Sequence, residues 1–337
     1  MTGQPFDRYL RQHLFEPLGM QHSDLLRSER VAANLATGYL VRARGLKTVK
    51  DYDIPTAPGG AVSSTARDVA SYLAGLLSAG ANNHGAVLEP ETVASLFAPH
   101  FQPDARVPGM GLGFELNDEG GHRVAAKSGI LSGFLAAITL APDDGIGVFV
   151  LTNTGGLSGQ GAAEPLATAL LRHVLGLPDQ AIRTDILARP EVWGELSGWY
   201  GMDPGPLANL FDRLVFGAGA EVVVRRGQLW LRPLSAIPTM RHGFPLHPDD
   251  EHDPYVFRLD LTDMGLGTFR VAFTPSSDQG RTRHRLEAGF LSMQQRPDAL
   301  NPRRCATGLV GAGAGALTIR RARRAHPFAR RPPGGGS

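Results

Sequence analysis

The sequence predicts an α+β fold, an antiparallel sheet flanked by helices, followed by a small all-β domain. Three observations support this class. Apolar residues recur at helical spacing in several segments before residue 176. Three short apolar runs between 123 and 151 are separated by turn signals. Six further short apolar runs, also separated by turn signals, lie between 192 and 297 and indicate a small β-sandwich or barrel.

Four helices are predicted from apolar spacing and end signals, at 5–20, 64–80, 90–97 and 162–175. The first ends at Pro17 and Gly19. The second opens on the hydroxyl-rich run Ser64–Asp68, which suits an N-cap, and ends at Gly80. Between the first two helices, Gly38–Arg42 is read as an extended stretch and Pro58–Gly60 as a turn or loop.

The strongest strand signal is a three-stranded antiparallel meander. Its strands are predicted at Val124–Ile130, Phe134–Leu140 and Val148–Leu151. The run Pro142–Gly145 is the clearest turn between them. A further strand is predicted at Gly111–Leu116, with glycines where another backbone comes close.

These elements predict four segments: an α+β domain at 1–178, a linker at 179–191, an all-β domain at 192–297 and a low-complexity tail at 298–337. The apolar runs of the all-β domain are Leu214–Phe216, Glu221–Arg225, Leu229–Leu231, Val256–Leu261, Phe269–Phe273 and Phe290–Met293. The tail is rich in Arg, Gly and Pro, so we expect it to be disordered.

Composition excludes several classes of protein. The single cysteine, Cys305, allows neither an internal disulfide nor a thiolate metal cluster. No run of 18 apolar residues is present, so no membrane span is expected, and no leader opens the chain, which leaves its localisation open. Eight Arg and no acidic residue lie in 301–337, so the other 300 residues carry a net charge of 2 − 8 = −6. Specific nucleic-acid binding by the body is therefore not expected.

Most common catalytic motifs are absent from the 337 residues. There is no Gly-x-Ser-x-Gly elbow, no phosphate-binding loop and no His-Glu-x-x-His. His242, His247 and His252 lie five residues apart in a Pro- and Asp-rich segment, where a polar loop is favoured over a metal site. No metal or cofactor is expected.

The run Lys127-Ser128-Gly129 suggests a substrate-binding role. The Lys127 ammonium could hold a substrate carboxylate, and the Ser128 hydroxyl could hydrogen-bond the same group. Gly129 would let an extended substrate lie against the strand edge. The simpler alternative is an edge strand with a solvated lysine.

Residues 3–153 resemble the β-lactamase-related serine hydrolases, which include class C β-lactamases, penicillin-binding proteins, DD-peptidases and esterases. The order and spacing of several short motifs carry this resemblance: Gly3–Phe6, Pro17–Met20, Ala36–Tyr39, Pro58–Asp68, Leu88–Glu91, Gly111–Phe114, Lys127–Gly129, Pro142–Val148 and Leu151–Asn153. It implies part of a β-lactamase/transpeptidase-like fold.

Within that resemblance, Lys127-Ser128-Gly129 corresponds to the Lys-Thr-Gly element that lines the active site. The backbone N–H of Ile130 would then be an oxyanion-hole donor. Residues 192–297 resemble the lipocalin-like β-domain that some members of the family carry.

The chain departs from the family at the nucleophile. The family's serine lies in Ser-x-x-Lys, but the positions three residues before the three lysines are Arg44, Lys47 and Val124. Tyr-x-Asn and Ser-x-Asn are also absent. We therefore expect a C-terminal portion of the family domain, truncated and inactive alone. Without the strands that would complete its sheet, the meander should expose an unpaired edge and an apolar face.

Three hypotheses follow. The first is a truncated serine hydrolase that would act on an ester, amide, lactam or D-Ala peptide. The second is half of a split enzyme, whose partner is a separate N-terminal half. The third is a non-catalytic module that binds peptide, glycan or lipid. A small-molecule or peptidoglycan-like substrate is expected if the site is completed.

Overall fold

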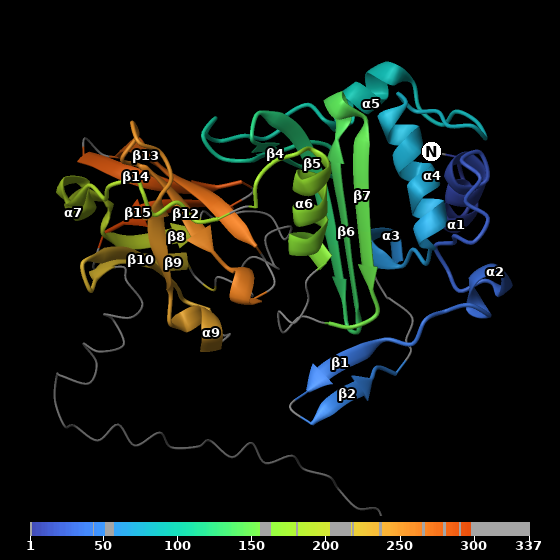
Figure 1. The fold of residues 1–337 in the computed structure, drawn as a ribbon, viewed down its shortest axis with the longest axis horizontal. Coiled ribbons are helices and arrows are strands. Elements are labelled where there is room, and N and C mark those ends of the chain that lie inside the picture. Colours follow the sequence, from blue (N-terminus) through green and yellow to red (C-terminus); the bar gives the residue numbers. More distant parts are fainter. Residues whose placement is uncertain are drawn as a thin grey trace, which may run out of the picture. The chain divides into compact units, whose positions relative to one another are not determined.

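An antiparallel sheet with helices on both faces and a closed β-barrel make up the described part of the chain (Figure 1). The computed structural model describes residues 2–42, 44–50, 57–155, 163–179, 181–202, 217, 219–235, 238–264, 267–278, 281–289 and 291–297. The predicted strand at Leu214–Phe216, the predicted tail at 298–337 and Cys305 lie outside these residues.

The predicted meander forms the centre of a five-stranded sheet. Its strands follow one another in the order β3-β4-β5-β6-β7, all antiparallel. The bounds are Gly109–Met110 (β3), Glu115–Glu119 (β4), His122–Leu131 (β5), Phe134–Ala141 (β6) and Ile146–Thr152 (β7). A tight turn at 132–133 joins β5 to β6, and a 3₁₀ turn at Pro142–Asp144 precedes β7. The three predicted strands and both turns are confirmed.

The predicted strand at Gly111–Leu116 is wrong over most of its length. Gly111–Phe114 instead connects β3 to β4, and the backbone N–H of Gly111 donates to Phe114 O at 2.8 Å. Gly113 has φ +85°, and a Cβ on Gly111 would lie 2.2 Å from Leu96 O. The glycines therefore mark a turn packed against a helix end rather than a strand.

The helices are short and lie mostly before residue 197. Their bounds are Phe6–Leu10 (α1), Glu29–Ala32 (α2), Ala57–Gly60 (α3), Ala66–Leu77 (α4), Pro90–Leu96 (α5), Ala163–Val174 (α6), Trp193–Leu196 (α7) and Pro238–Arg241 (α9), with a π-helical turn at Arg11–Phe15. The four predicted helices are therefore confirmed, the first as α1 and its π-helical continuation. The turn or loop predicted at Pro58–Gly60 is the end of α3 instead.

Helices cover both faces of the sheet because each presents one apolar stripe. On one face, Leu73 and Leu76 of α4 pack against Ala125 and Leu140 of the sheet. On the other face, α6 supplies buried small and apolar residues to the sheet: Ala163 and Ala167 against Leu135, Ala137 and Val150. Thr65 caps α4 by accepting a hydrogen bond from Asp68 N.

A two-stranded hairpin begins at the end of the sequence motif Ala36–Tyr39 and lies beside the end of the five-stranded sheet. Tyr39–Arg42 (β1) pairs with Gly45–Thr48 (β2), and both strands are drawn in blue in Figure 1. The extended stretch predicted at Gly38–Arg42 is confirmed as β1. Its partner β2 was not predicted, because Gly45–Thr48 has no apolar alternation.

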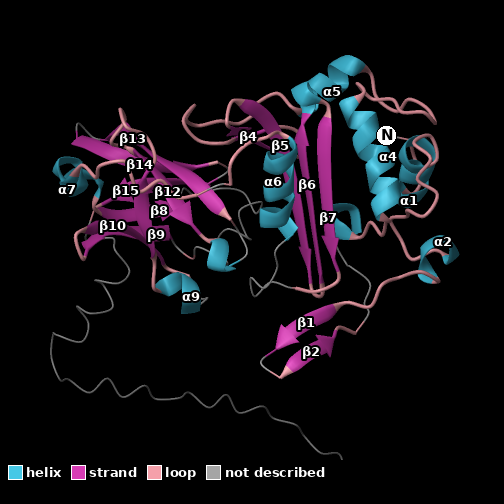
Figure 2. Ribbon diagram, in the orientation of Figure 1, coloured by secondary structure: helices cyan, strands magenta, loops and turns pink. Residues whose placement is uncertain are grey.

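The β-rich part after residue 197 is a closed eight-stranded barrel rather than a sandwich. Strands dominate it, whereas helices gather around the five-stranded sheet (Figure 2). The strands are Gly198–Met202 (β8), Gly219–Arg225 (β9), Gln228–Pro233 (β10), Phe244–Pro248 (β11), Val256–Asp260 (β12), Thr268–Asp278 (β13), Arg281–Ala288 (β14) and Leu291–Arg296 (β15). Alternate side chains fill its interior, with Tyr200, Phe257 and Phe273 packed edge to face.

Residues 1–297 form one unit, in which a loop before β3 contacts the barrel. Val107 is buried together with Val256 and Ala272. The predicted boundaries at 178 and 191 remain predictions. Within the described residues, no helix is long and apolar enough to span a membrane.

Candidate functional site

The edge of β5 is open along the segment that carries the Lys-Ser-Gly motif. Pairing with β4 ends at Glu115↔Ala126, whereas pairing with β6 continues to Leu131↔Phe134. Among the described strands, residues 127–131 therefore have a partner on one side alone. Gly129 and Ile130 are exposed, and a Cβ on Gly129 would meet nothing within 4 Å. This backbone can accept an extended ligand as an added strand.

The four predicted site residues lie in this open segment, on alternating faces of the strand. Lys127 lies two positions after Ala125 and therefore on the same face of β5, and Ala125 is buried against α4. Ser128 lies on the opposite face, as does Val124, which is buried against Leu171 of α6. Ile130 follows Gly129 and pairs with Leu135. The structure thus presents Lys127 and Ser128 at one exposed edge, directed to its two faces.

Two glutamates accompany Ser128 on the α6 face. Glu164, in the first turn of α6, lies close enough to Ser128 for the Ser128 side chain to lower its pKa. Glu115 of β4 is directly opposite Ala126, and residues in such a pair share a face. Ser128 is two positions beyond Ala126, so Glu115 lies on its face of the sheet.

The environment of these carboxyls favours their protonated forms. Burial, followed by the nearby charge of Glu164, raises the pKa of Glu115 to about 7, while Lys127 opposes the shift. Burial also raises the pKa of Glu164, and the Ser128 side chain acts in the opposite direction. The site therefore holds two acidic groups whose charged states are costly.

Several motif segments converge at the adjacent end of the sheet. Tyr39 N donates to Asn153 O at 2.9 Å, and Gly155 N donates to Tyr39 O at 3.0 Å. A Cβ on Gly38 would lie 2.7 Å from the Phe134 ring, so this close approach requires glycine. Segments 114 residues apart in the sequence are thereby joined next to the tip of the β5–β6 hairpin.

The serines before α4 have structural partners. Ser64 Oγ lies 2.7 Å from Ser23 Oγ, and Ser23 Oγ donates to buried Asp68 Oδ2 at 2.6 Å. The backbone of Ser63 bridges to Asp24 in both directions. These contacts give Ser63 and Ser64 structural roles before α4, and within the predicted hydroxyl-rich run the cap is Thr65.

The three histidines of the polar segment are not gathered into one site. His247 lies in β11, whereas His252 donates its backbone N–H to Asp250 at 2.9 Å in the loop before β12. In the described part of the chain, no group of three or more His, Cys, Asp or Glu side chains is placed to hold a metal ion.

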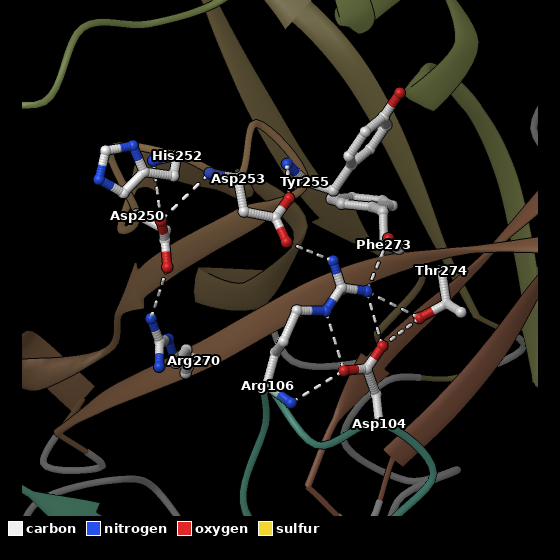
Figure 3. Close-up of polar contacts among 9 residues, drawn as sticks. All are labelled: Asp104, Arg106, Asp250, His252, Asp253, Tyr255, Arg270, Phe273 and Thr274. Atoms are coloured by element: carbon white, nitrogen blue, oxygen red, sulfur yellow. Dashed lines mark hydrogen bonds and ion pairs between the residues drawn. The ribbon is translucent and has the colours of Figure 1, made fainter.

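A charged cluster joins the loop before β3 to the barrel (Figure 3). Arg106 donates to Asp104 and, at 2.7 Å, to Asp253 of the barrel. It also reaches the carbonyl of Phe273 and the hydroxyl of Thr274, both at 3.2 Å. The hydrogen bond from Arg106 holds the pKa of Asp104 well below its usual range.

The same loop and the barrel meet beside the candidate site. Gly289, in the turn between β14 and β15, has φ +60°, and a Cβ there would lie 3.5 Å from Glu115 Oε1. Pro108 is the other neighbour of this position, at 3.7 Å. The barrel therefore contributes backbone next to Glu115.

Sequence reasoning did not identify Glu115, Glu164 or Arg106 as functional. Glu164 is separated from Ser128 by 36 residues and Glu115 pairs through a register that no local pattern fixes. The sequence offered one signal, which is the alternation of side chains between the two faces of β5. This alternation assigns Ser128 to a face of the sheet that the predicted helix at 162–175 could cover.

Comparisons with known proteins agree with this architecture. The family described as Beta-lactamase matches residues 1–193. A Homo sapiens protein described as beta-lactamase-like 1 is 30% identical over 154 residues, which is 43% of this chain and 29% of that protein. Among solved structures, SurE aligns with a TM-score of 0.51 at 18% identity, covering 88% of this chain and 64% of SurE.

A penicillin-binding protein homologue from Pyrococcus abyssi, described as octameric, aligns with a TM-score of 0.47 at 19% identity, covering 87% of this chain and 61% of that protein. The chain thus spans less than two thirds of the length of each of these relatives.

The sheet, its flanking helices and the Lys-Ser-Gly strand define a protein with a β-lactamase/transpeptidase-like fold. Because the family match covers more than half of its residues, the chain belongs to the Beta-lactamase family.

Proposed function

We propose that this chain supplies the substrate-binding wall of a β-lactamase-related serine hydrolase. In this proposal the open edge of β5 binds the substrate, Lys127 and Ser128 contact it, and the N–H of Ile130 stabilises the oxyanion. The observation that carries the proposal is the unpaired, exposed stretch at Gly129–Ile130 within the family's motif strand.

The nucleophile is then supplied from outside these 337 residues. None of the three lysines is preceded by serine at the third position, so no residue pair here matches Ser-x-x-Lys. Acyl transfer to ester, amide, lactam or D-Ala peptide substrates requires such a serine. We infer that the chain alone does not turn over substrate, whether it is a truncated form or half of a split enzyme.

The outer edge of the sheet supports a completing partner. In the described residues, β6 is the one strand that pairs with β7. Leu151 of β7 is 49% exposed, and α6 exposes Leu166, Leu170 and Val174 in successive turns. An open strand edge and an apolar helix stripe are surfaces that further strands and a helix would cover.

The barrel at 192–297 fits the further proposal of an appended lipocalin-like domain. Its interior is occupied by buried aromatic and aliphatic side chains such as Tyr200 and Phe273. This packing favours a structural role for the barrel over lipid binding in its lumen. Recognition of a peptide or glycan without turnover is the alternative function.

The test measures hydrolysis of a chromogenic cephalosporin and a p-nitrophenyl ester. The purified chain is assayed alone and after co-production with the polypeptide encoded immediately upstream of its first codon. We expect background rates alone and turnover when the upstream polypeptide carries Ser-x-x-Lys. Serine-dependent turnover by the chain alone would overturn the proposal, as would ligand binding with no turnover in the completed assembly.

In the completed assembly, Lys127→Ala should lower kcat/KM by about 100-fold, because it removes a charged contact from the active site. Lys47→Ala is the matched control, since Lys47 is exposed on β2, outside the site. Equal effects of the two substitutions would contradict the role of Lys127.

A further inference from the structure

His284 of β14 is a histidine enclosed in the barrel. Its side chain points inward, since Leu286, two positions along the same strand, belongs to the buried interior cluster. His284 is 3% exposed, and its Nδ1 atom has no hydrogen-bond partner among the described residues. Buried polar atoms in folded proteins almost always have a partner, so this ring nitrogen calls for an explanation.

Helix α7 covers one end of the barrel. Trp193 and Leu196 of this helix belong to the same buried cluster as the side chains of the barrel interior. The Tyr200 hydroxyl, also in that cluster, donates to the carbonyl of Leu196 at 2.9 Å. Because a helix of four residues is not stable by itself, these contacts with the barrel hold α7 in place.

Glu195 of α7 is linked to His284 through two shared neighbours. The Tyr255 hydroxyl donates to Glu195 Oε1 at 2.6 Å, and the Tyr255 ring stacks on the His284 ring with centroids 5.8 Å apart. Gln295 of β15 donates from Nε2 to the Glu195 carbonyl at 2.9 Å. The Oε1 atom of the same glutamine accepts from the backbone N–H of His284 at 3.1 Å. The buried histidine therefore lies directly beneath the helix that closes the barrel.

The surroundings of His284 favour its neutral form. Burial lowers the pKa of His284, while the charge and backbone of Glu195 act in the opposite direction. The Glu195 carboxylate is exposed, and solvent weakens its attraction for a charge on the ring. Tyr255, whose pKa is raised by its bond to Glu195, is neutral near pH 7, and Gln295 of β15 and Pro275, opposite on β13, carry no charge. A proton added at Nδ1 would therefore be buried without an acceptor.

We propose that His284 is an acid-sensitive latch on α7: the neutral ring lets the helix close the barrel end, and protonation releases the helix so that water reaches the ring. The release is local, because the rest of the interior cluster consists of apolar side chains and a tyrosine, none of which titrates in mild acid. Since α7 ends the segment that connects α6 to the barrel, its release loosens that connection. This inference does not depend on the proposed function.

The test follows Trp193, which is 9% exposed when α7 is closed. The full chain is produced with 5-fluorotryptophan, and the Trp193 signal in the fluorine NMR spectrum is identified by its loss in Trp193→Phe. The shift of each signal between H2O and D2O measures how far that ring is exposed to water. Between pH 7.5 and pH 5.5 this isotope shift should rise about threefold for Trp193 and stay constant for Trp230 of β10.

Three further variants separate the latch from other effects of acid. His284→Phe keeps a ring against Tyr255 but takes up no proton, so the isotope shift of Trp193 should be the same at both pH values. Tyr255→Phe removes the hydrogen bond to Glu195 and should raise the isotope shift of Trp193 about twofold already at pH 7.5. His247→Gln is the matched control and should keep the full response. Burial also lowers the pKa of His247, but this residue lies in β11, which does not pair with β14.

A Trp193 signal that is unchanged by acid in the unmodified chain would overturn the inference, whether or not the variants fold. An acid response that persists in His284→Phe would also overturn it. So would an equal rise at all three tryptophans, because that result would report unfolding of the whole barrel rather than release of α7.

Discussion

Arg106 donates a hydrogen bond to Asp253 at 2.7 Å, across 147 residues of sequence. Through this contact the loop before β3 is tied to the barrel (Figure 3). The turn at Gly289 of the same barrel lies near Glu115. The barrel therefore lies next to the candidate site on β5.

Substituting Arg106 should destabilise the folded chain. Arg106→Gln leaves Asp104 and Asp253 without their cation, and Asp104 is largely buried. We expect the free energy of unfolding to fall by about 2 kcal/mol, measured by urea denaturation. Arg183→Gln is the control, because its ion pairs with Asp185 and Glu251 are exposed and should contribute nothing measurable. Equal losses of stability in Arg106→Gln and Arg183→Gln would contradict a stabilising role of the Arg106 cluster.

The Arg106 cluster also predicts sensitivity to acid. The pKa of Asp104 is lowered in the folded state, so its contribution is present above the pKa of the unfolded chain, near 4. That contribution is lost as the pH falls further. The loss of stability from pH 5 to pH 3 should therefore be smaller in Arg106→Gln than in the unmodified chain. If the loss of stability from pH 5 to pH 3 is the same in the two proteins, Asp104 is not its source.

Glu115 should make the chain less stable as the pH rises. Its pKa of about 7 in the folded state exceeds the ordinary value of 4.5, mainly because of burial. Between these values the unfolded chain releases a proton that the folded chain retains, so stability falls by up to roughly 3 kcal/mol.

Urea unfolding at pH 5 and pH 8 measures this effect. Glu115→Gln should remove most of the fall, whereas Glu91→Gln should keep it. If Glu115→Gln loses as much stability between the two pH values as the unmodified chain, the assignment to Glu115 is wrong.

Truncation of two adjacent leucines of α6 should lower stability by very different amounts. Leu171 is fully buried against Val124 and Ala141, so Leu171→Ala should cost about 2–5 kcal/mol of stability. Leu170 is 42% exposed and should cost less than about 1 kcal/mol when truncated. Chemical denaturation of both variants checks the difference, and a cost at Leu170 as large as that at Leu171 would show that its apolar stripe is already covered.

The sequence was most informative where strand and turn signals are local. The meander at 123–151 was predicted because Pro142–Gly145 is a strong turn signal and the flanking runs are β-rich. The repeated short strands predicted a sandwich or barrel without deciding between them, and β8, β11 and β14 were missed. His284 and Glu287 in β14 are buried polar residues that interrupt its apolar pattern.

Only part of the candidate site could be predicted from the sequence. Lys127, Ser128 and Gly129 could be proposed because their order matches a family motif. Glu115 and Glu164 could not, since their approach to Ser128 depends on the β4–β5 register and on the packing of α6. Such long-range pairing is encoded in packing rather than in local residue order.

Covalent labelling tests most directly whether the catalytic serine lies outside this chain. The purified 337-residue protein is incubated with a fluorophosphonate and, separately, with a penicillin, and its intact mass is then measured. We expect the unmodified mass in both experiments. A stoichiometric adduct that maps to a single serine of this chain would contradict it.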